Sequence, residues 1–263
     1  MTRLTTFPDA EATAARAAVE IARELERARA LRGVAHVALS GGSTPKRTYE
    51  LLAGELTDWD GVEVWFADER CVPPEDEESN YRLAAETLLR PAGIDPARVH
   101  RMEGELGPEE GARRYAEALR ASLATAGAPA AGAPAAGASP DSPGGAATAA
   151  EELPVLDLIV LGIGPDGHVA SLFGGAATLD AGEQAICLGV RESPKPPPER
   201  ITLSLAVLRA ARRCMLLATG AGKADAIAAA LAEPTHHVPA SLLTRERLTV
   251  IVDDAASPPP GAR

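Results

Sequence analysis

Apolar residues recur along the chain at two spacings, one typical of helices and one typical of buried strands. Between Asp9, which is suited to cap a helix, and Gly33, alanine and aliphatic residues return at helical spacing. Beyond Gly33, short apolar runs of strand length alternate with segments of helical pattern. We predict strands at 36–39, 62–66, 156–161, 185–190, 201–203, 214–218 and 248–252, and helices from residue 45 onward and at 79–89, 108–119 and 223–232. This alternation predicts an α/β fold around a mostly parallel sheet.

Residues 121–150 interrupt the alternation. They hold 14 alanines, 5 glycines and 4 prolines, and Asp141 is their only charged residue. Glycine and proline stop alanine from propagating a helix, and the segment has too few large apolar side chains to form a packed core. We predict a disordered surface insertion without an assigned function, and we expect residues 1–263 otherwise to form a single domain.

The composition narrows the classes of function. The formal net charge is −11 and aromatic residues make up 3% of the chain. Nucleic-acid binding needs a basic face or a stacking surface, so we expect no nucleic-acid partner. Three scattered cysteines, Cys71, Cys187 and Cys214, indicate a reducing compartment, and no apolar run approaches the ~18 residues of a membrane span. We therefore expect a cytoplasmic protein with no membrane partner. The sequence carries no signal for the oligomeric state, and a monomer is the default expectation.

A glycine turn between a strand and a helix is the first candidate site. Ser40-Gly41-Gly42-Ser43-Thr44 follows the strand at 36–39, and Pro45 suits the first turn of the next helix. Two glycines let the backbone approach a ligand, and a helix N-terminus offers unpaired N–H donors and a partial positive charge. We predict that this turn binds an anion such as phosphate. The alternative is a capped turn without a ligand.

Two other segments place charged residues where a ligand could reach them. Asp68-Glu69-Arg70 follows the strand at 62–66, and ligands bind at the carboxyl edge of parallel sheets. The proline-rich residues 193–202 include Lys195 and Arg200, whose side chains can reach a phosphate. The alternatives are a solvated charge cluster for the first segment and a polar loop for the second.

Residues 162–168 follow the strand at 156–161 and have the G-x-G-x-x-G spacing of a dinucleotide-binding loop. Against that interpretation, a following helix could run only from about His168 to Phe173, and Pro165 and Asp166 stand where the pyrophosphate would lie. Imidazole titrates near neutral pH, and a nearby carboxylate can fix its tautomer. We therefore predict that His168 is a general base oriented by Asp166. A structural histidine is the alternative.

Three other motifs are excluded because the chain lacks residues that they require. Gly222-Lys223 is not a P-loop, because Leu217 stands where the first glycine belongs and Ala224 where serine or threonine is required. His236 and His237 have no carboxylate or thiolate at ligand spacing, so we predict no metal and no cofactor. No serine stands in a G-x-S-x-G run, so a serine esterase is not indicated.

Taken together, these segments resemble the glucosamine-6-phosphate isomerase/6-phosphogluconolactonase family, and within it the lactonases. The resemblance rests on their joint order and covers most of the chain outside residues 121–150. The matching segments are 40–45, 68–70, 79–80, 162–173 and 193–202. Gly174 departs from the proline that we would expect at its position. The fold that the resemblance implies is a three-layer α/β sandwich with a Rossmann-like sheet, shared with glucosamine-6-phosphate deaminases.

The resemblance also implies an activity, which is the hydrolysis of 6-phospho-D-glucono-1,5-lactone to 6-phosphogluconate in the oxidative pentose phosphate pathway. Asp166 would orient His168, which would take a proton from the attacking water and return it to the ring oxygen. The turn at 40–44 would hold the 6-phosphate, and basic side chains would contact the phosphate or the sugar. The implied binding residues are Ser40, Gly41, Gly42, Ser43, Thr44, Arg70, Lys195 and Arg200, with Asp68 and Asn80 as possible additions.

Two alternatives come from different classes. A glucosamine-6-phosphate deaminase would resemble Ile-Ala-Phe-Asn-Glu-Pro after the Gly-His pair and Asp-Glu-Tyr in the earlier motif. Here Phe173 occupies the position of that carboxylate and Arg70 that of the tyrosine, which favours the lactonase. A non-catalytic sugar-phosphate sensor would keep the phosphate-binding turn without needing Asp166 or His168. It would normally be fused to a DNA-binding domain, for which we find no spare basic segment.

Overall fold

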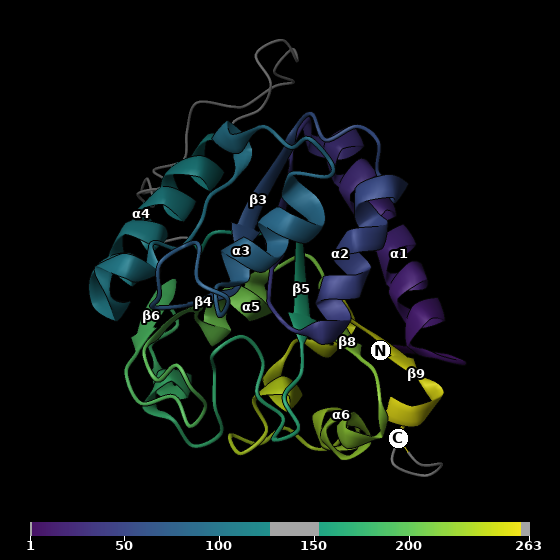
Figure 1. The fold of residues 1–263 in the computed structure, drawn as a ribbon. Helices are drawn as coiled ribbons and strands as arrows, with labels where there is room; N and C mark the ends of the chain where they lie inside the picture. The colour runs from purple at the N-terminus through teal and green to yellow at the C-terminus, as the bar shows by residue number, and fades with distance from the viewer. Residues whose placement is uncertain (1, 127–152, 259–263) are drawn as a thin grey trace, which may run out of the picture.

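The computed structural model describes residues 2–126 and 153–258. In these ranges, six strands form one sheet in the order β1-β9-β8-β5-β2-β3, and neighbouring strands run parallel throughout (Figure 1). The strands are β1 (Arg3–Phe7), β2 (Ala35–Leu39), β3 (Val62–Phe66), β5 (Leu158–Gly162), β8 (Cys214–Ala218) and β9 (Leu248–Asp253). The predicted α/β class with a mostly parallel sheet is confirmed.

Helices connect most of these strands. They are α1 (Ala10–Arg32), α2 (Ser43–Glu55), α3 (Asn80–Ala84) with its π-helical continuation Ala85–Leu89, α4 (Pro108–Ala126), α5 (Leu205–Ala210) and α6 (Ala224–Leu231). The first helix begins and ends where the sequence predicts. The Asp9 carboxylate accepts the N–H of Ala12 at 2.8 Å, and Gly33 ends the helix with a left-handed φ of 77°. Helices α1 and α2 pack against each other beside the sheet (Figure 1).

Short 3₁₀ turns complete the described chain. They are Pro96–Arg98, Gly104–Leu106, Ala177–Asp180, Ala221–Lys223, Pro239–Leu242, Arg245–Arg247 and Asp254–Ala256.

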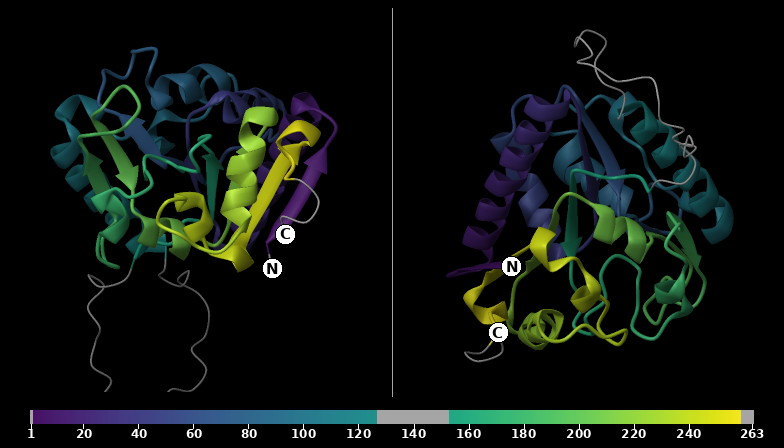
Figure 2. Two further views of the ribbon diagram at one scale, coloured as in Figure 1. Left: turned by 90° about the horizontal axis from the view of Figure 1, so that it is seen from below. Right: turned by 180° about the vertical axis from the view of Figure 1, so that it is seen from behind.

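Strands β1 and β9, purple and yellow in Figure 2, lie next to each other at one edge of the sheet. Strands β2, β8 and β9 are buried along their whole length, so the core is built from aliphatic side chains on both faces of the sheet.

A second sheet contains three antiparallel strands in the order β4-β7-β6. These are β4 (Asp68–Arg70), β7 (Arg200–Leu203) and β6 (Cys187–Val190), and α4 packs against β6 and β7. The strands predicted at 185–190 and 201–203 therefore exist, but they lie outside the main sheet. The register places Arg70 opposite Arg200, which brings two of the predicted charged segments together.

The structure differs from the sequence prediction at several places, among them the three-residue strand β4, which was not predicted. Strand β1 was not predicted, because its edge position leaves it only partly buried and its sequence is largely polar. Helix α5 was also not predicted. No helix forms at 168–173; an isolated bridge joins Val169 to Leu172, and Ala170 between them has a φ of 49°. Helix α4 continues to Ala126, so residues 121–126 of the predicted insertion are helical.

The extension of α4 has a local cause. Alanine favours helix, the first glycine of the segment stands at 127, and Leu123 packs against the core. Residues 127–150, the remainder of the predicted insertion, lie outside the described residues.

Candidate active site

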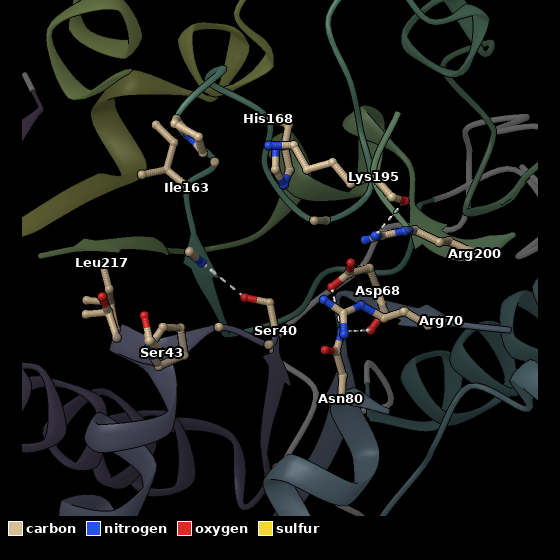
Figure 3. Close-up of a pocket in the computed structure, with 18 of the residues that line it drawn as sticks. Ser40, Ser43, Asp68, Arg70, Asn80, Ile163, His168, Lys195, Arg200 and Leu217 are labelled. Carbon is tan, nitrogen blue, oxygen red and sulfur yellow. Dashed lines mark hydrogen bonds between the residues drawn. The ribbon is translucent and has the colours of Figure 1, made fainter. Parts of the chain in front are cut away.

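One cavity of about 320 Å³ lies at the carboxyl ends of β2, β5 and β8, beside β4 (Figure 3). The residues predicted to bind a ligand all line it, and so does His168. They are Ser40, Gly41, Gly42, Ser43, Thr44, Asp68, Arg70, Asn80, Lys195 and Arg200. Asp166 does not line the cavity itself, but it contacts His168, which does. The structure thus brings the separate sequence motifs to one place, at the edge of a parallel sheet where ligands bind.

Hydrogen bonds fasten the turn between β2 and α2. Ser40 Oγ donates to the carbonyl of Val160 at 2.9 Å and accepts the N–H of Gly162 at 3.2 Å, which ties the end of β2 to β5. The hydroxyl of Tyr49 accepts the Ser40 N–H at 3.1 Å and donates to the Ser40 carbonyl at 2.8 Å. The buried Ser40 hydroxyl therefore holds the turn in place, and the residues after it are left to face the cavity.

The N-terminus of α2 faces the cavity through Ser43 and Thr44. Gly42 before it has a φ of 117°, which L side chains rarely adopt. Gly41 must also lack a side chain, because a Cβ there would lie 2.0 Å from Asn80 Oδ1. The 13-residue helix has no acidic residue in its first turn, so its partial positive charge is uncompensated at this end. This arrangement suits an anionic group of a ligand.

A histidine that is hydrogen-bonded to a carboxylate lies at the same cavity as this turn. His168 Nδ1 lies 2.5 Å from Asp166 Oδ1, and the loop that carries both is closed by the Gly164 N–H, which donates to the His168 carbonyl at 2.9 Å. A Cβ on Gly164 would lie 2.0 Å from His168 Nδ1, so the pair folds back over a glycine. Because Nδ1 is engaged, Nε2 is the ring nitrogen left for a ligand.

Burial lowers the pKa of His168, and the hydrogen bond and charge of Asp166 oppose this only in part. Burial alone would raise the pKa of Asp166, but the hydrogen bond to His168 and the charges of His168 and Lys195 outweigh it, so that pKa lies below its ordinary value. At neutral pH the pair is therefore a carboxylate beside a neutral imidazole, which can accept a proton.

A second carboxylate, Asp68, has polar partners for both oxygens. Asn80 Nδ2 donates to Asp68 Oδ1 at 3.1 Å and to the Asp68 carbonyl at 2.9 Å. Ser171 Oγ donates to Asp68 Oδ2 at 2.7 Å. Asp68 and Asn80 are both buried, so their side chains form a fixed polar wall beside the cavity (Figure 3).

Among the described residues that line the cavity, four are basic, namely Arg70, Lys195, Arg200 and Lys223. The guanidinium of Arg70 donates to the carbonyl of Glu78 and lies 3.6 Å from the Glu78 carboxylate. The buried Nε of Arg70 has no hydrogen-bond partner among the described residues. Lys195 Nζ lies 3.4 Å from Asp166 Oδ2. Both side chains thus keep donors for an anion.

Arg200 differs from the other cations because it is almost fully buried. Its Nε donates to the carbonyl of Pro197 at 3.0 Å, and Nη2 donates to the carbonyls of Lys195 and Pro196 at 3.1 and 3.0 Å. Its guanidinium carbon lies 5.7 Å from the centre of the Phe173 ring. Arg200 therefore lines the cavity but uses most of its donors to hold the segment that carries Lys195.

Lys223 is the cavity residue that the sequence analysis missed. Its Nζ donates to the carbonyl of Ile163 at 2.7 Å, and burial together with the charge of Lys195 lowers its pKa. The Gly222-Lys223 pair after β8 is the signal that could have identified it, although the pair was considered only as a P-loop. The neighbouring Thr219 contacts Thr44 through the two hydroxyls, 2.8 Å apart, and so joins the loop to α2.

A second hollow of about 540 Å³ lies near the residues that precede β5, β8 and β9. Three of the arginines that line it have partners within the fold. Arg32 pairs with Asp157 at 2.6 Å, Arg213 with Glu24 at 3.2 Å, and Arg247 donates to the carbonyl of Ala210 at 2.9 Å. We therefore place the candidate site at the carboxyl edge of the sheet.

The part of the chain that the structure describes lacks two features. It holds no group of three or more His, Cys, Asp or Glu residues that could bind a metal ion. None of its helices has both the length and the hydropathy needed to cross a membrane.

The fold and the cavity define a class of α/β protein in which a helix N-terminus and a histidine–carboxylate pair lie at the same cavity. The pattern of the family described as glucosamine-6-phosphate isomerases/6-phosphogluconolactonase matches residues 8–252. The chain is 37% identical to the 6-phosphogluconolactonase of Streptomyces coelicolor over 87% of this chain and 82% of that protein. It is 34% identical to the 6-phosphogluconolactonase of Mycobacterium tuberculosis over 95% and 96%. The chain belongs to this family.

Solved structures agree with this assignment. The 6-phosphogluconolactonase of Trypanosoma brucei superposes with a TM-score of 0.75 at 26% identity, covering 97% of each chain. A monomeric glucosamine-6-phosphate deaminase superposes with a TM-score of 0.73 at 19% identity, covering 97% of this chain and 98% of the other. At that identity the second likeness shows the shared fold alone.

Proposed function

We propose that the protein hydrolyses 6-phospho-D-glucono-1,5-lactone to 6-phospho-D-gluconate, with His168 as the general base. The observation that carries this proposal is the His168–Asp166 pair at the wall of a cavity that also holds the N-terminus of α2. The proposal is supported by relatives named 6-phosphogluconolactonase that are more than 30% identical over most of the chain. The two alternatives that remain are a deaminase and a sensor.

The reaction needs a base and a means to hold the lactone. Asp166 accepts a hydrogen bond from His168 Nδ1–H, which leaves Nε2 to take a proton from water as the water oxygen attacks the lactone carbonyl carbon. When the bond between that carbon and the ring oxygen breaks, Nε2 returns the proton to the ring oxygen. A lactone is a reactive ester, so an oriented base and a few hydrogen-bond donors suffice, and the proposed mechanism uses no metal.

The net negative charge of the protein repels an anionic substrate, and the cations in the cavity counteract this repulsion. The protein carries a formal net charge of −11, and the substrate is a phosphate ester. In the proposed complex, Ser43 and Thr44 at the start of α2 hold the 6-phosphate. Arg70 and Lys195 contact the phosphate or the sugar oxygens, and Arg200 and Lys223 add positive charge to the same cavity.

Phe173 favours the lactonase over the deaminase. The sequence pattern of deaminases would place a carboxylate at this position to support the histidine. Phe173 is buried instead, with its ring centre 4.7 Å from that of His168. An apolar ring at that distance supplies no second acceptor for the imidazole, so Asp166 is left as its carboxylate partner.

The test is the rate of acid release from freshly prepared lactone at neutral pH, with uncatalysed opening subtracted. We expect activity that survives a metal chelator and falls about 10²–10⁴-fold in His168→Ala. His237→Ala is the control, because that exposed histidine does not line the cavity. Wild-type protein without activity above background would reject the proposal, and ammonia release from glucosamine 6-phosphate would then test the deaminase.

A further inference from the structure

Glu69 is a buried carboxylate surrounded by hydrogen-bond donors. It is 3% exposed and does not line the cavity. Its Oε1 accepts the N–H groups of Arg70 and Asn80, each at 2.7 Å. Its Oε2 accepts the N–H of Tyr81 at 2.8 Å and the hydroxyl of Ser79 at 3.0 Å. Four donors on two oxygens leave this carboxylate fully engaged.

The four donors belong to two segments that both reach the cavity. Arg70 ends β4, whereas residues 79–81 form the start of α3, where Ser79 is the N-cap. Burial raises the pKa of Glu69, and the four hydrogen bonds oppose this rise. In the described part of the chain no side-chain nitrogen of Lys, Arg or His forms an ion pair with the Glu69 carboxylate. Hydrogen bonds rather than an ion pair therefore hold the two segments together.

The consequence for the cavity is that one side chain fixes two others. Asn80 is held at its backbone by Glu69, and its side chain donates to Asp68 and closely approaches Gly41. Arg70 is held at its backbone by Glu69, and its guanidinium donates to the carbonyl of Glu78, the residue before Ser79. A shift of the start of α3 would move both Asn80 and the partner of Arg70.

We infer that Glu69 is a positioning residue for the reaction, which sets the placement of Arg70 and Asn80 without touching the substrate. This inference rests on the proposed function. Glutamine cannot replace the carboxylate, because it offers one acceptor oxygen and turns an NH₂ group toward the remaining donors. The Ser79 hydroxyl can rotate to accept from that NH₂ group, but the N–H of Tyr81 would lose its partner.

The experiment compares Glu69→Gln with Asp157→Asn, a matched variant at the other end of the sheet. Asp157 is also a buried carboxylate, which accepts the N–H of His36 at 2.8 Å and pairs with Arg32 at 2.6 Å. We expect both variants to lower the Tm. Only Glu69→Gln should raise the KM for the lactone, by about tenfold or more, with kcat changed less than about threefold, because Arg70 and Asn80 bind ground state and transition state alike.

Ser79→Ala is the second variant, because it removes one of the four donors and is expected to fold. It should raise the KM in the same direction by a smaller factor. An unchanged KM in Glu69→Gln at a lowered Tm would overturn the inference, and so would an unchanged KM in Ser79→Ala if Glu69→Gln does not fold.

Failure of the proposed function is recognised separately. If wild-type protein does not open the lactone, the proposed function is rejected, and calorimetric binding of inorganic phosphate to wild type, Glu69→Gln and Asp157→Asn becomes the readout. Weaker binding in Glu69→Gln alone would then support the positioning role. Equal binding in all three proteins, or no binding to wild type, would overturn it.

Discussion

Arg200 donates to the backbone carbonyl of Lys195 at 3.1 Å, five residues before it in the chain. Together with the bonds to Pro196 and Pro197, this contact gives a buried guanidinium three carbonyl partners on one short segment. From that segment the ammonium of Lys195 reaches to 3.4 Å from the Asp166 carboxylate. The position of one cavity cation thus depends on another, and the two should not act independently.

Arg200→Lys is therefore expected to raise the KM for the lactone by about 10–100-fold, as the loss of one or two charge-assisted hydrogen bonds predicts. A lysine ammonium lacks the planar fork that bonds several carbonyls at once. The measurement is a double-mutant cycle with Lys195→Met. If Arg200 acts through Lys195, the double variant will resemble the more affected single variant. Fully additive effects would show that the two cations contact the substrate separately.

Gly164→Ala is expected to lower kcat by about 10²-fold or more while leaving the protein folded. Its Cβ would lie 2.0 Å from His168 Nδ1 and 2.3 Å from Asp166 Oδ1, so the hydrogen-bonded pair must move apart. Gly182→Ala is the matched control, since a Cβ there would meet no atom within 4 Å. Steady-state kinetics and Tm measure both effects. Wild-type turnover in Gly164→Ala would contradict the arrangement of the pair.

The pH dependence of kcat/KM tests the protonation state of His168. Burial lowers its pKa below the ordinary value of about 6.5, and the neutral ring is the base. The rate should therefore rise with pH and reach its plateau with a midpoint below about 6.5. Asp166→Asn removes a charge that raises this pKa, so the midpoint should move lower still, and the plateau should fall about 10²–10⁴-fold. A midpoint that moves upward in the variant would contradict this assignment.

The two glycine-bearing loops of the cavity could be predicted from the sequence because their determinants are local. At Gly41-Gly42 a strand, a glycine turn and a helix start follow one another within a few residues, and at 162–168 a strand leads into a glycine-supported histidine. Ser40 lines the cavity as part of the predicted turn, but the hydrogen bond from its hydroxyl to the carbonyl of Val160, 120 residues away, was not predicted. A contact of that sequence separation leaves no local signal.

The contacts of Lys223 and Glu69 also join residues that are far apart in the sequence, so they could not be predicted from it. Lys223 bonds the carbonyl of Ile163, 60 residues away, and enters the cavity because β5 and β8 are neighbours in the sheet. Glu69 was part of a recognised motif, but three of its four donors lie 10–12 residues further on, at a helix start whose position depends on packing. The three-residue strand β4 has no periodic pattern at all, so its pairing with β7 could not be predicted.

His36 gives a prediction about stability rather than activity. It is 3% exposed, and its Nδ1 accepts the indole N–H of Trp65 at 3.2 Å. Its buried Nε2 has no hydrogen-bond partner in the described residues. Burial lowers its pKa, which the charges of Asp157 and Glu63 oppose only in part. The folded protein thus holds His36 neutral at a pH where the unfolded chain already binds a proton.

Since the unfolded state binds more protons below about pH 6.5, the free energy of unfolding should fall as the pH is lowered through that value. The test is the Tm at about pH 7.5 and pH 5.5 for wild type and His36→Gln. Glutamine can still accept from Trp65 Nε1 but does not titrate, and all other ionisable groups are common to both proteins. Wild type should therefore lose more of its Tm on acidification than His36→Gln. An equal loss in the two proteins would mean that other groups carry the acid sensitivity.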